Sequence, residues 1–255
     1  QVAVAGVKIE GIYGFETDHV ILAIGHSARD TFSMLYELGV AIEPKPFSIG
    51  VRIEHPQAMV DQAQFGRCAG HPNLCHADYK LFHHYHNGRS VYTFCMCPGG
   101  EVIAASSETG GVVTNGMSTH SRNKPNANSA LLVGVRSDDF GSDHPLAGIE
   151  FQRRWERAAY RIGGENYHAP VQLVSDFLAG QASVSLGEVK PSYTPGVKTA
   201  DLAQCLPDIV TMALREGITS LDRRLRGFAR PDAVLTGVET RSSSPVRISR
   251  GAGLE

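Results

Sequence analysis

Two thiols and a glycine pair lie close together in the segment Cys95-Met96-Cys97-Pro98-Gly99-Gly100. Cysteines separated by one residue can shuttle electrons or form a strained, easily reduced disulfide, and adjacent glycines let the backbone approach a planar ligand. Residues i and i+2 of a strand point to the same face, so both sulfurs can instead fill a core. Cys95 and Cys97 are therefore candidates for redox catalysis, with core packing as the alternative.

Histidines gather in one stretch of the chain, which raises the question of a metal site: His76, His83, His84 and His86. Their spacing matches no standard zinc pattern, and the nearby Cys68 and Cys75 are separated by a loop, unlike the tight cysteine pairs of structural zinc. We expect solvent-facing histidines on strands, and we predict no metal site.

Two arginines on predicted strands, Arg52 and Arg89, have the chemistry to hold an acidic substrate, because a guanidinium binds a carboxylate through two parallel hydrogen bonds. A surface salt bridge explains each of them equally well. Arg153 and Arg154, on a predicted helix, are interpreted as part of its solvated face.

A strand-to-helix junction in residues 17–30 is the main element that would position a ligand. Five consecutive apolar residues in 19–24 predict a buried strand, which Gly25 ends before a helix that begins near Ser27 and continues to Leu38. Ser27 and Asp30 have the spacing of a capping pair, and Gly39 marks the end of the helix. The beginning of a helix after such a turn is a place where a phosphate can bind.

This junction resembles the second cofactor-contacting motif of FAD-dependent oxidoreductases, Thr-x-x-h-h-h-A-x-G, in which h is hydrophobic. Together with residues 26–32, 45–56, 93–100 and 237–247, it resembles a family of bacterial proteins described as uncharacterised FAD-dependent dehydrogenases. The resemblance implies that FAD is contacted by residues near both ends of the chain: Ala23, Gly25, His26, Ser27, Arg29, Thr240, Arg241 and Ser243. For the last three, polar turn chemistry is the alternative. The resemblance also implies substrate contacts by Gly99 and Gly100, and we add Arg52 as a substrate candidate.

The Gly-x-Gly-x-x-Gly turn that seats a pyrophosphate in dinucleotide-binding folds does not follow any predicted strand. Nor does the sequence contain the glycine-rich closing segment that the resemblance implies beyond residue 250. We therefore interpret the chain as an internal piece of a longer protein, in which the full-length protein binds FAD and this piece binds it poorly or not at all.

Composition sets further bounds. The chain has 255 residues, a net charge of −2 and a pI near 6.6, which gives no electrostatic reason to expect nucleic acid or an anionic membrane as a partner. No apolar run has the length of a membrane span. Five cysteines and no secretion signal predict reduced thiols in the cytoplasm.

The element pattern predicts an α+β fold in which a domain of mixed antiparallel sheet and helices is inserted between remnants of an α/β FAD-binding domain. Two prolines in residues 43–46 place the first boundary, so the division is 1–44, 45–230 and 231–255. Predicted strands are 2–10, a half-buried 47–55, a meander of 79–85, 89–95, 101–106 and 112–115 with an Asn87-Gly88 hairpin turn, then 130–136, 233–240 and its partner 246–249. Predicted helices are 57–66, 149–163, 169–178, 201–206, 207–216 ending at Gly217, and 220–226.

The function that the resemblance implies is oxidation or reduction of an unidentified small molecule by bound FAD, in the full-length protein. No acid or base can be assigned, and we expect the chain alone to be inactive. The alternative is a module that binds a partner or forms a homodimer without catalysis of its own.

Overall fold

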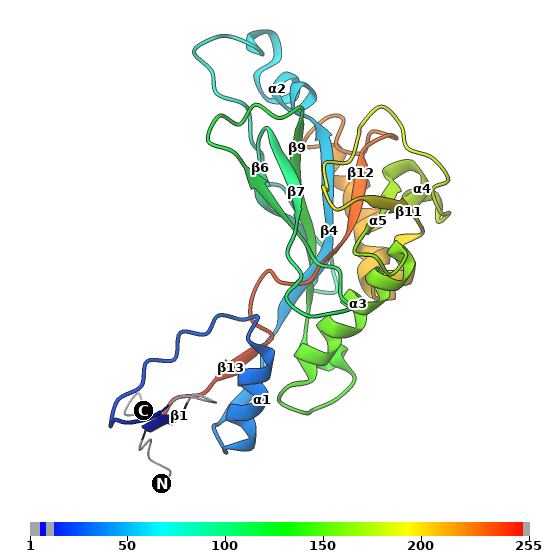
Figure 1. Cartoon of the computed structure of the whole chain (residues 1–255). Helices are drawn as coiled ribbons and strands as arrows, with labels where there is room; N and C mark the ends of the chain where they lie inside the picture. Colours follow the sequence, from blue (N-terminus) through cyan, green and yellow to red (C-terminus); the bar gives the residue numbers. More distant parts are fainter. Residues whose placement is uncertain (1–5, 9–12, 252–255) are drawn as a thin grey trace.

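The computed structural model describes residues 6–8 and 13–251, which form an elongated molecule with a large and a small lobe (Figure 1). The large lobe is built on a seven-stranded sheet with the order β11-β10-β12-β4-β9-β6-β5. All neighbours in this sheet are antiparallel except β10 and β11. Its strands are β4 (Phe47–Pro56), β5 (Phe82–His84), β6 (Ser90–Cys97), β9 (Asn126–Val135), β10 (Ala169–Leu173), β11 (Val197–Thr199) and β12 (Val234–Glu239). The mixture of sheet and helix confirms the predicted α+β class.

Strand β4 is central, and it is buried on both faces. It pairs with β9 over ten residues and with β12 on its other side. The alternating pattern of residues 47–55 predicted a half-buried strand, and this prediction is wrong because the polar positions Ser48, Arg52 and Glu54 are also buried. The charge of Arg52 is satisfied inside the protein, which allows a polar residue to occupy the second face.

Helices cover one side of the sheet. α5 (Asp208–Asp222) contacts β4, β5, β6 and β9, while α3 (Ala147–Gly163) contacts β10, β11 and β12. α5 continues past Gly217, where we predicted a helix end. An added Cβ at Gly217 would lie 2.7 Å from Cγ1 of Val91, so this glycine permits close packing of helix on strand. The other helices of the large lobe are α2 (Gln57–Phe65) and α4 (Val174–Ala179), with short 3-10 turns at Gly66–Cys68, Ser137–Phe140 and Leu202–Cys205.

The predicted meander is only partly present. The Asn87-Gly88 turn joins β5 to β6, as expected, and Gly88 has a φ of 76°. β7 (Gly100–Ala104) and β8 (Thr114–Ser118) instead form a separate two-stranded sheet. β8 contacts β4, β6, β9 and β12, so this hairpin covers one face of the large sheet.

The small lobe contains α1 (Arg29–Glu37) and the pair β3 (Ile42–Pro44) and β13 (Val246–Ile248) (Figure 1). Residues 246–249 were predicted to pair with 233–240, but β13 pairs with β3 and thereby joins residues 246–248 to residues 42–44. Phe32, Ile42 and Val246 of this lobe form a small core with Ile149 of α3. Of the predicted strand 2–10, only β1 (Gly6–Lys8) lies within the described residues, and it pairs with β2 (Gly14–Glu16).

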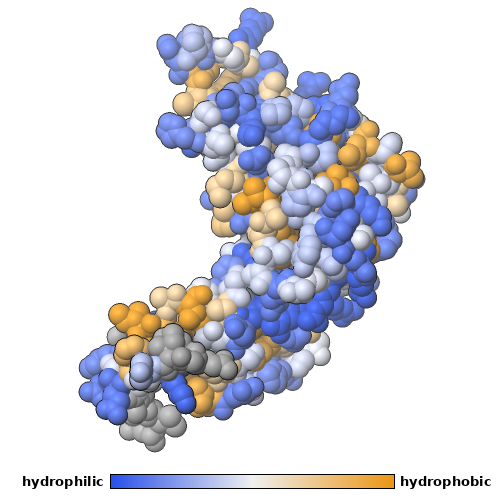
Figure 2. Space-filling view, in the orientation of Figure 1, coloured by the Kyte–Doolittle hydropathy of each residue, from blue (hydrophilic) through white to orange (hydrophobic). Residues whose placement is uncertain are grey.

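The predicted buried strand in residues 19–24 is wrong, because this segment is extended, unpaired and mostly exposed, with Ile21 at 94% exposure. A strand needs a neighbour to bind its backbone groups, and none of the described strands lies beside it. The helix begins at Arg29, not Ser27, and Ala28 rather than Ser27 precedes it without a side-chain cap. Gly39 ends the turn after it with a φ of 83°, as predicted. Exposed apolar residues gather on the small lobe (Figure 2).

The domain division at residues 44 and 230 stays a prediction. β12 lies between β10 and β4 in the large sheet, so residues 234–239 share a sheet with residues of the predicted insert.

Candidate functional site

The buried carboxylate of Glu156 is the centre of a cluster that gathers predicted cofactor residues from both ends of the chain. Arg29 donates to both of its oxygens, at 2.9 Å and 2.7 Å. The Thr240 hydroxyl donates to Oε1 at 2.6 Å, and Arg241 adds contacts at 3.2 Å and 3.4 Å. Arg29 and Glu156 are 1% and 2% exposed, so this is a buried ion pair.

Further polar groups extend the cluster. Gln152, one turn before Glu156 on α3, accepts from Arg29 at 2.9 Å and donates to the Thr240 carbonyl at 2.7 Å. Glu108 accepts from Arg29 at 2.6 Å. At the outer edge, Arg241 donates to the hydroxyls of Ser27, at 3.0 Å, and of Ser107.

Four separate segments supply these side chains. Arg29 is the first residue of α1, Gln152 and Glu156 lie on α3, Glu108 lies in the loop between β7 and β8, and residues 240–241 follow β12. The cluster therefore fastens α1 of the small lobe to the helical side of the large lobe. Sequence reasoning missed its acidic members. The sequence did contain one signal for them. Gln152 and Glu156 are four residues apart, which places both on one face of the helix, beside the buried Ala159.

The charges of the cluster keep its carboxylates ionised. Burial opposes ionisation of Glu156, but hydrogen bonds and charge from Arg29 and Arg241 lower its pKa below the ordinary value. The pKa of Glu108 falls to about 2, chiefly through its hydrogen bonds with Arg153 and Arg29. Arg153 is thus part of this network, and the prediction that it belongs to a solvated face is wrong, since its side chain is 21% exposed and pairs with Glu108 and Glu150.

Beside the cluster, the glycine turn of the predicted FAD motif lines a hollow of about 210 Å³. Its walls come from residues 22–26, Phe32, Ser244 and Ile248. Gly25 has a φ of 71° and open space where a Cβ would be. Nδ1 of His26 is buried and has no hydrogen-bond partner among residues 6–8 and 13–251, and burial with the charges of Arg241 and Arg29 lowers the pKa of this imidazole.

These features fit part of a flavin-nucleotide site. Because the glycine turn has open space beside it, part of a ligand can approach the backbone there. Nδ1 of His26 can then form a hydrogen bond with that ligand. Arg241 is close enough for its charge to act on His26, and its side chain is 8% exposed. Ala23 lines the hollow, whereas the Ser243 side chain has no hydrogen bond to the described residues.

Arg52 forms a second buried cluster on the sheet. Its guanidinium binds Glu239 at 2.5 Å and 3.2 Å, Asn115 at 2.7 Å, Asn128 at 3.2 Å and the Cys95 carbonyl at 2.9 Å. The side chain is 0% exposed, so its donors are engaged within the protein. Glu239 precedes Thr240 and Arg241, and residues 239–241 consequently join the Arg52 and Glu156 clusters. Arg89, the other predicted clamp, forms a partly buried bidentate pair with Asp139 at 2.7 Å and 2.8 Å.

The two cysteines lie at a β-bulge, where the register between β6 and β9 shifts between Phe94 and Cys97. Cys95 is exposed and has a φ of 44°, a conformation that non-glycine residues rarely adopt. Cys97 is half-buried, and burial raises the pKa of its thiol. We considered above that both sulfurs point to one face of a strand and fill the core. The bulge breaks the strand alternation that this alternative requires, and both thiols are free.

Gly99 and Gly100 are buried, and close backbone contacts explain them. A Cβ on Gly99 would lie 1.6 Å from the Arg122 carbonyl oxygen, and one on Gly100 would lie 2.4 Å from that of Met117.

The histidines are placed singly: His83 binds Ser220, His84 binds Ser90 and His76 binds Asp61. No group of three or more metal-binding side chains occurs among residues 6–8 and 13–251.

The fold and the Glu156 cluster define an α+β domain that brings together residues predicted to contact a flavin nucleotide. Residues 46–242 match the family model described as "FAD-dependent protein, C-terminal domain-like". The match covers most of the chain, and the chain belongs to this family of FAD-dependent proteins. This confirms the FAD-dependent part of the resemblance.

One relative, an uncharacterized protein of Clostridium beijerinckii (strain ATCC 51743 / NCIMB 8052), is 54% identical over 237 residues. The alignment covers 92% of this chain and 44% of that protein, so the chain spans less than half the length of this relative. None of the helices in the described part of the chain is long and apolar enough to cross a membrane.

Proposed function

We propose that this chain is part of an FAD-dependent oxidoreductase that acts on a small molecule, and that residues 23–29 with Thr240 and Arg241 form one side of its cofactor site. The observation that supports it best is the convergence on Glu156. Three of the predicted cofactor residues, Arg29, Thr240 and Arg241, bind this one buried carboxylate, although Arg29 is more than two hundred positions from the other two in the sequence.

Each group has a distinct part in the proposed site. Glu156 neutralises Arg29 and orients Arg241, and it thereby holds the turn at Gly25 in a fixed position. His26 and Arg241 would meet the ligand directly, the first through Nδ1 of its ring and the second as a hydrogen-bond donor to an anionic group. Bound FAD would supply the redox chemistry, while the protein supplies binding and orientation.

The test uses the full-length protein that we expect to contain this sequence. Purified protein should show the visible absorption of oxidised flavin, and this absorption should bleach on anaerobic reduction. Colourless protein that takes up no added FAD would refute the proposal. FAD titrated onto the 255-residue chain alone should bind weakly or not at all, since we expect the pyrophosphate turn in another segment.

A pair of variants on one helix tests the role of the cluster. Glu156→Gln removes the buried charge, whereas Glu150→Gln removes an exposed one on the same helix, with a side chain that is 63% exposed. We expect weaker FAD binding only in the first variant. Equal affinity in both would show that Glu156 has no part in the cofactor site.

The remaining assignments are also proposals. Substrate contacts by Gly99, Gly100 and Arg52 require movement or a ligand edge that reaches their buried positions. The proposed contact by Arg52 would be tested by steady-state kinetics of an Arg52→Lys variant with an identified substrate. A homodimer is proposed as the assembly, and light scattering coupled to size exclusion gives its mass directly.

A further inference from the structure

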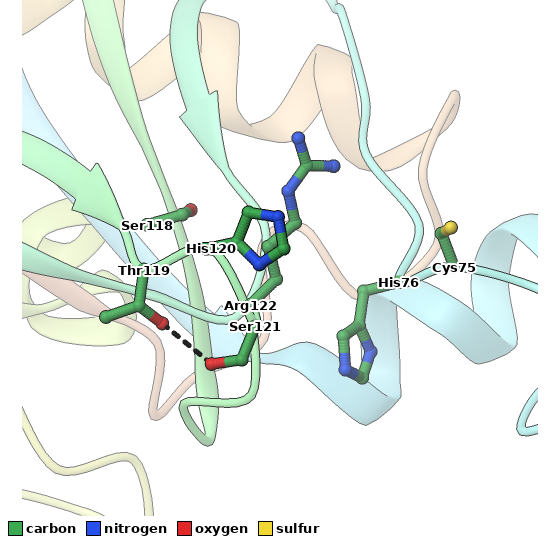
Figure 3. A pocket seen from close by; sticks show the side chains of 7 residues that line it. All are labelled: Cys75, His76, Ser118, Thr119, His120, Ser121 and Arg122. Carbon is green, nitrogen blue, oxygen red and sulfur yellow. Dashed lines mark hydrogen bonds between the residues drawn. The ribbon is translucent and has the colours of Figure 1, made fainter.

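A second hollow, of about 480 Å³, lies at the end of the large lobe away from α1. Its walls come from two loops, residues 75–76 before β5 and residues 118–122 between β8 and β9. Figure 3 shows the side chains of His120, Arg122 and Ser121 on one wall and those of His76 and Cys75 on the other. Three hydroxyls, two imidazoles and a guanidinium therefore surround one open space: Ser118, Thr119, Ser121, His76, His120 and Arg122.

The loop that carries Arg122 is fixed against the turn at Gly99. Arg122 has a φ of 49°, and its carbonyl oxygen lies where a side chain on residue 99 would be. Ser118 donates to the Pro98 carbonyl at 2.8 Å, and the Lys124 amide donates to the Gly99 carbonyl at 3.2 Å. A strained non-glycine residue held by its surroundings is typical of functional sites. These contacts explain the two glycines by close backbone packing, without any direct contact with a substrate.

The opposite wall is fixed as well. Asp61 binds the His76 ring at 3.2 Å and accepts from the Ala77 amide at 2.7 Å. Gln57 joins the two walls, because it donates to Asp61 at 2.9 Å and accepts from the Gly99 amide at 2.7 Å. Both sides of the hollow are thus connected by one chain of hydrogen bonds.

The charge of the hollow favours an anion. No carboxylate of the described residues lies within ion-pair distance of Arg122, whereas Arg29, Arg52 and Arg89 each have an acidic partner. The hydroxyls of Thr119 and Ser121 lie 3.1 Å apart at the rim. A neighbouring hollow of about 340 Å³ shares Cys75, His76 and Arg122 and is also lined by Asp78.

We propose that this hollow binds the phosphate group of a small molecule, with Arg122 as its principal ligand and the rings of His76 and His120 and the hydroxyl of Thr119 as further donors. A guanidinium matches the geometry of a phosphate through parallel hydrogen bonds, and several donors around one space suit its three terminal oxygens better than the two of a carboxylate. The proposal does not depend on bound flavin, since it concerns a different end of the molecule (Figure 1).

The test is a titration of the 255-residue chain with inorganic phosphate at constant ionic strength, followed by the amide chemical shifts of residues 75–76 and 118–122. Saturable shifts at these amides are expected. Arg122→Gln should weaken binding about tenfold or more, because hydrogen bonds to charged groups are among the strongest. Arg157→Gln, which removes an exposed arginine from α3, should leave the affinity unchanged.

Two outcomes would overturn the proposal. One is the absence of saturable shifts in the wild-type chain. The other is equal phosphate affinity in the Arg122→Gln and Arg157→Gln variants, with circular dichroism showing that both are folded. Acetate serves as the comparison anion, and binding as tight as that of phosphate would refute the assignment to a phosphate group. Because no flavin is present, a failure here is distinct from a failure of the proposed oxidoreductase function.

Discussion

Replacement of Glu156 by glutamine tests the central physical argument, that one buried carboxylate joins the two lobes. The substitution keeps the shape of the side chain and removes the charge opposite Arg29, which is 1% exposed. Breaking a buried ion pair from one side typically costs about 3–5 kcal/mol, because the remaining charge is left buried. Arg29 keeps its contacts with Glu108 and Gln152, so we expect a loss near the lower end, about 3 kcal/mol.

The assay is urea unfolding followed by the fluorescence of Trp155, the one tryptophan of the chain and the neighbour of Glu156. Glu150→Gln is the control, since the loss of an exposed helix pair should cost less than about 0.5 kcal/mol. Hydrogen exchange adds a local measurement, in which the amides of α1 should exchange faster in Glu156→Gln than in the control. Equal stability and equal exchange in the two variants would refute the argument.

Three further predictions concern other parts of the molecule. Burial lowers the pKa of His55 to about 4 from 6.5. As the pH falls from 6.5 to about 4, the unfolded chain binds a proton at His55 and the folded chain does not. The free energy of unfolding should therefore fall by about 3 kcal/mol over this pH range. Unfolding free energies that do not change across it would contradict this. Gly217→Ala should destabilise the chain in urea unfolding despite its better helix propensity, because the added methyl meets Val91 at 2.7 Å. Serine at Cys95 or Cys97 in the full-length protein should slow flavin reduction if the thiols are redox active, and unchanged kinetics in both variants would exclude that role.

The sequence was sufficient for elements whose determinants are local. The apolar stripe of residues 149–163 predicted a helix, and the structure has one at Ala147–Gly163. The Asn87-Gly88 hairpin and the end of α1 near Gly39 were also correct, because a turn with positive φ depends on the residues within it. The α+β class followed from such elements together. The predicted FAD-dependent family came from motif resemblance and agrees with the family match over residues 46–242.

Predictions failed where the outcome depends on a neighbour distant in the sequence. Residues 19–24 have the composition of a buried strand, but no described strand pairs with them. Gly217 has the composition of a helix end, yet it lies inside α5, where the absence of a side chain makes room for Val91 of β6. Likewise, β13 pairs with β3 rather than with β12.

The candidate site shows the same division. Its basic and hydroxyl members, Arg29, Thr240 and Arg241, were named from sequence motifs. Their acidic partner Glu156 was not, since an isolated glutamate on a helix is most often a solvated residue. Only the tertiary structure shows it at 2% exposure between groups from both ends of the chain. A motif can specify which residues are suited to a cofactor, whereas the burial that converts their charges into a fixed site is decided by the packing of α1 and α3 around residues 239–241.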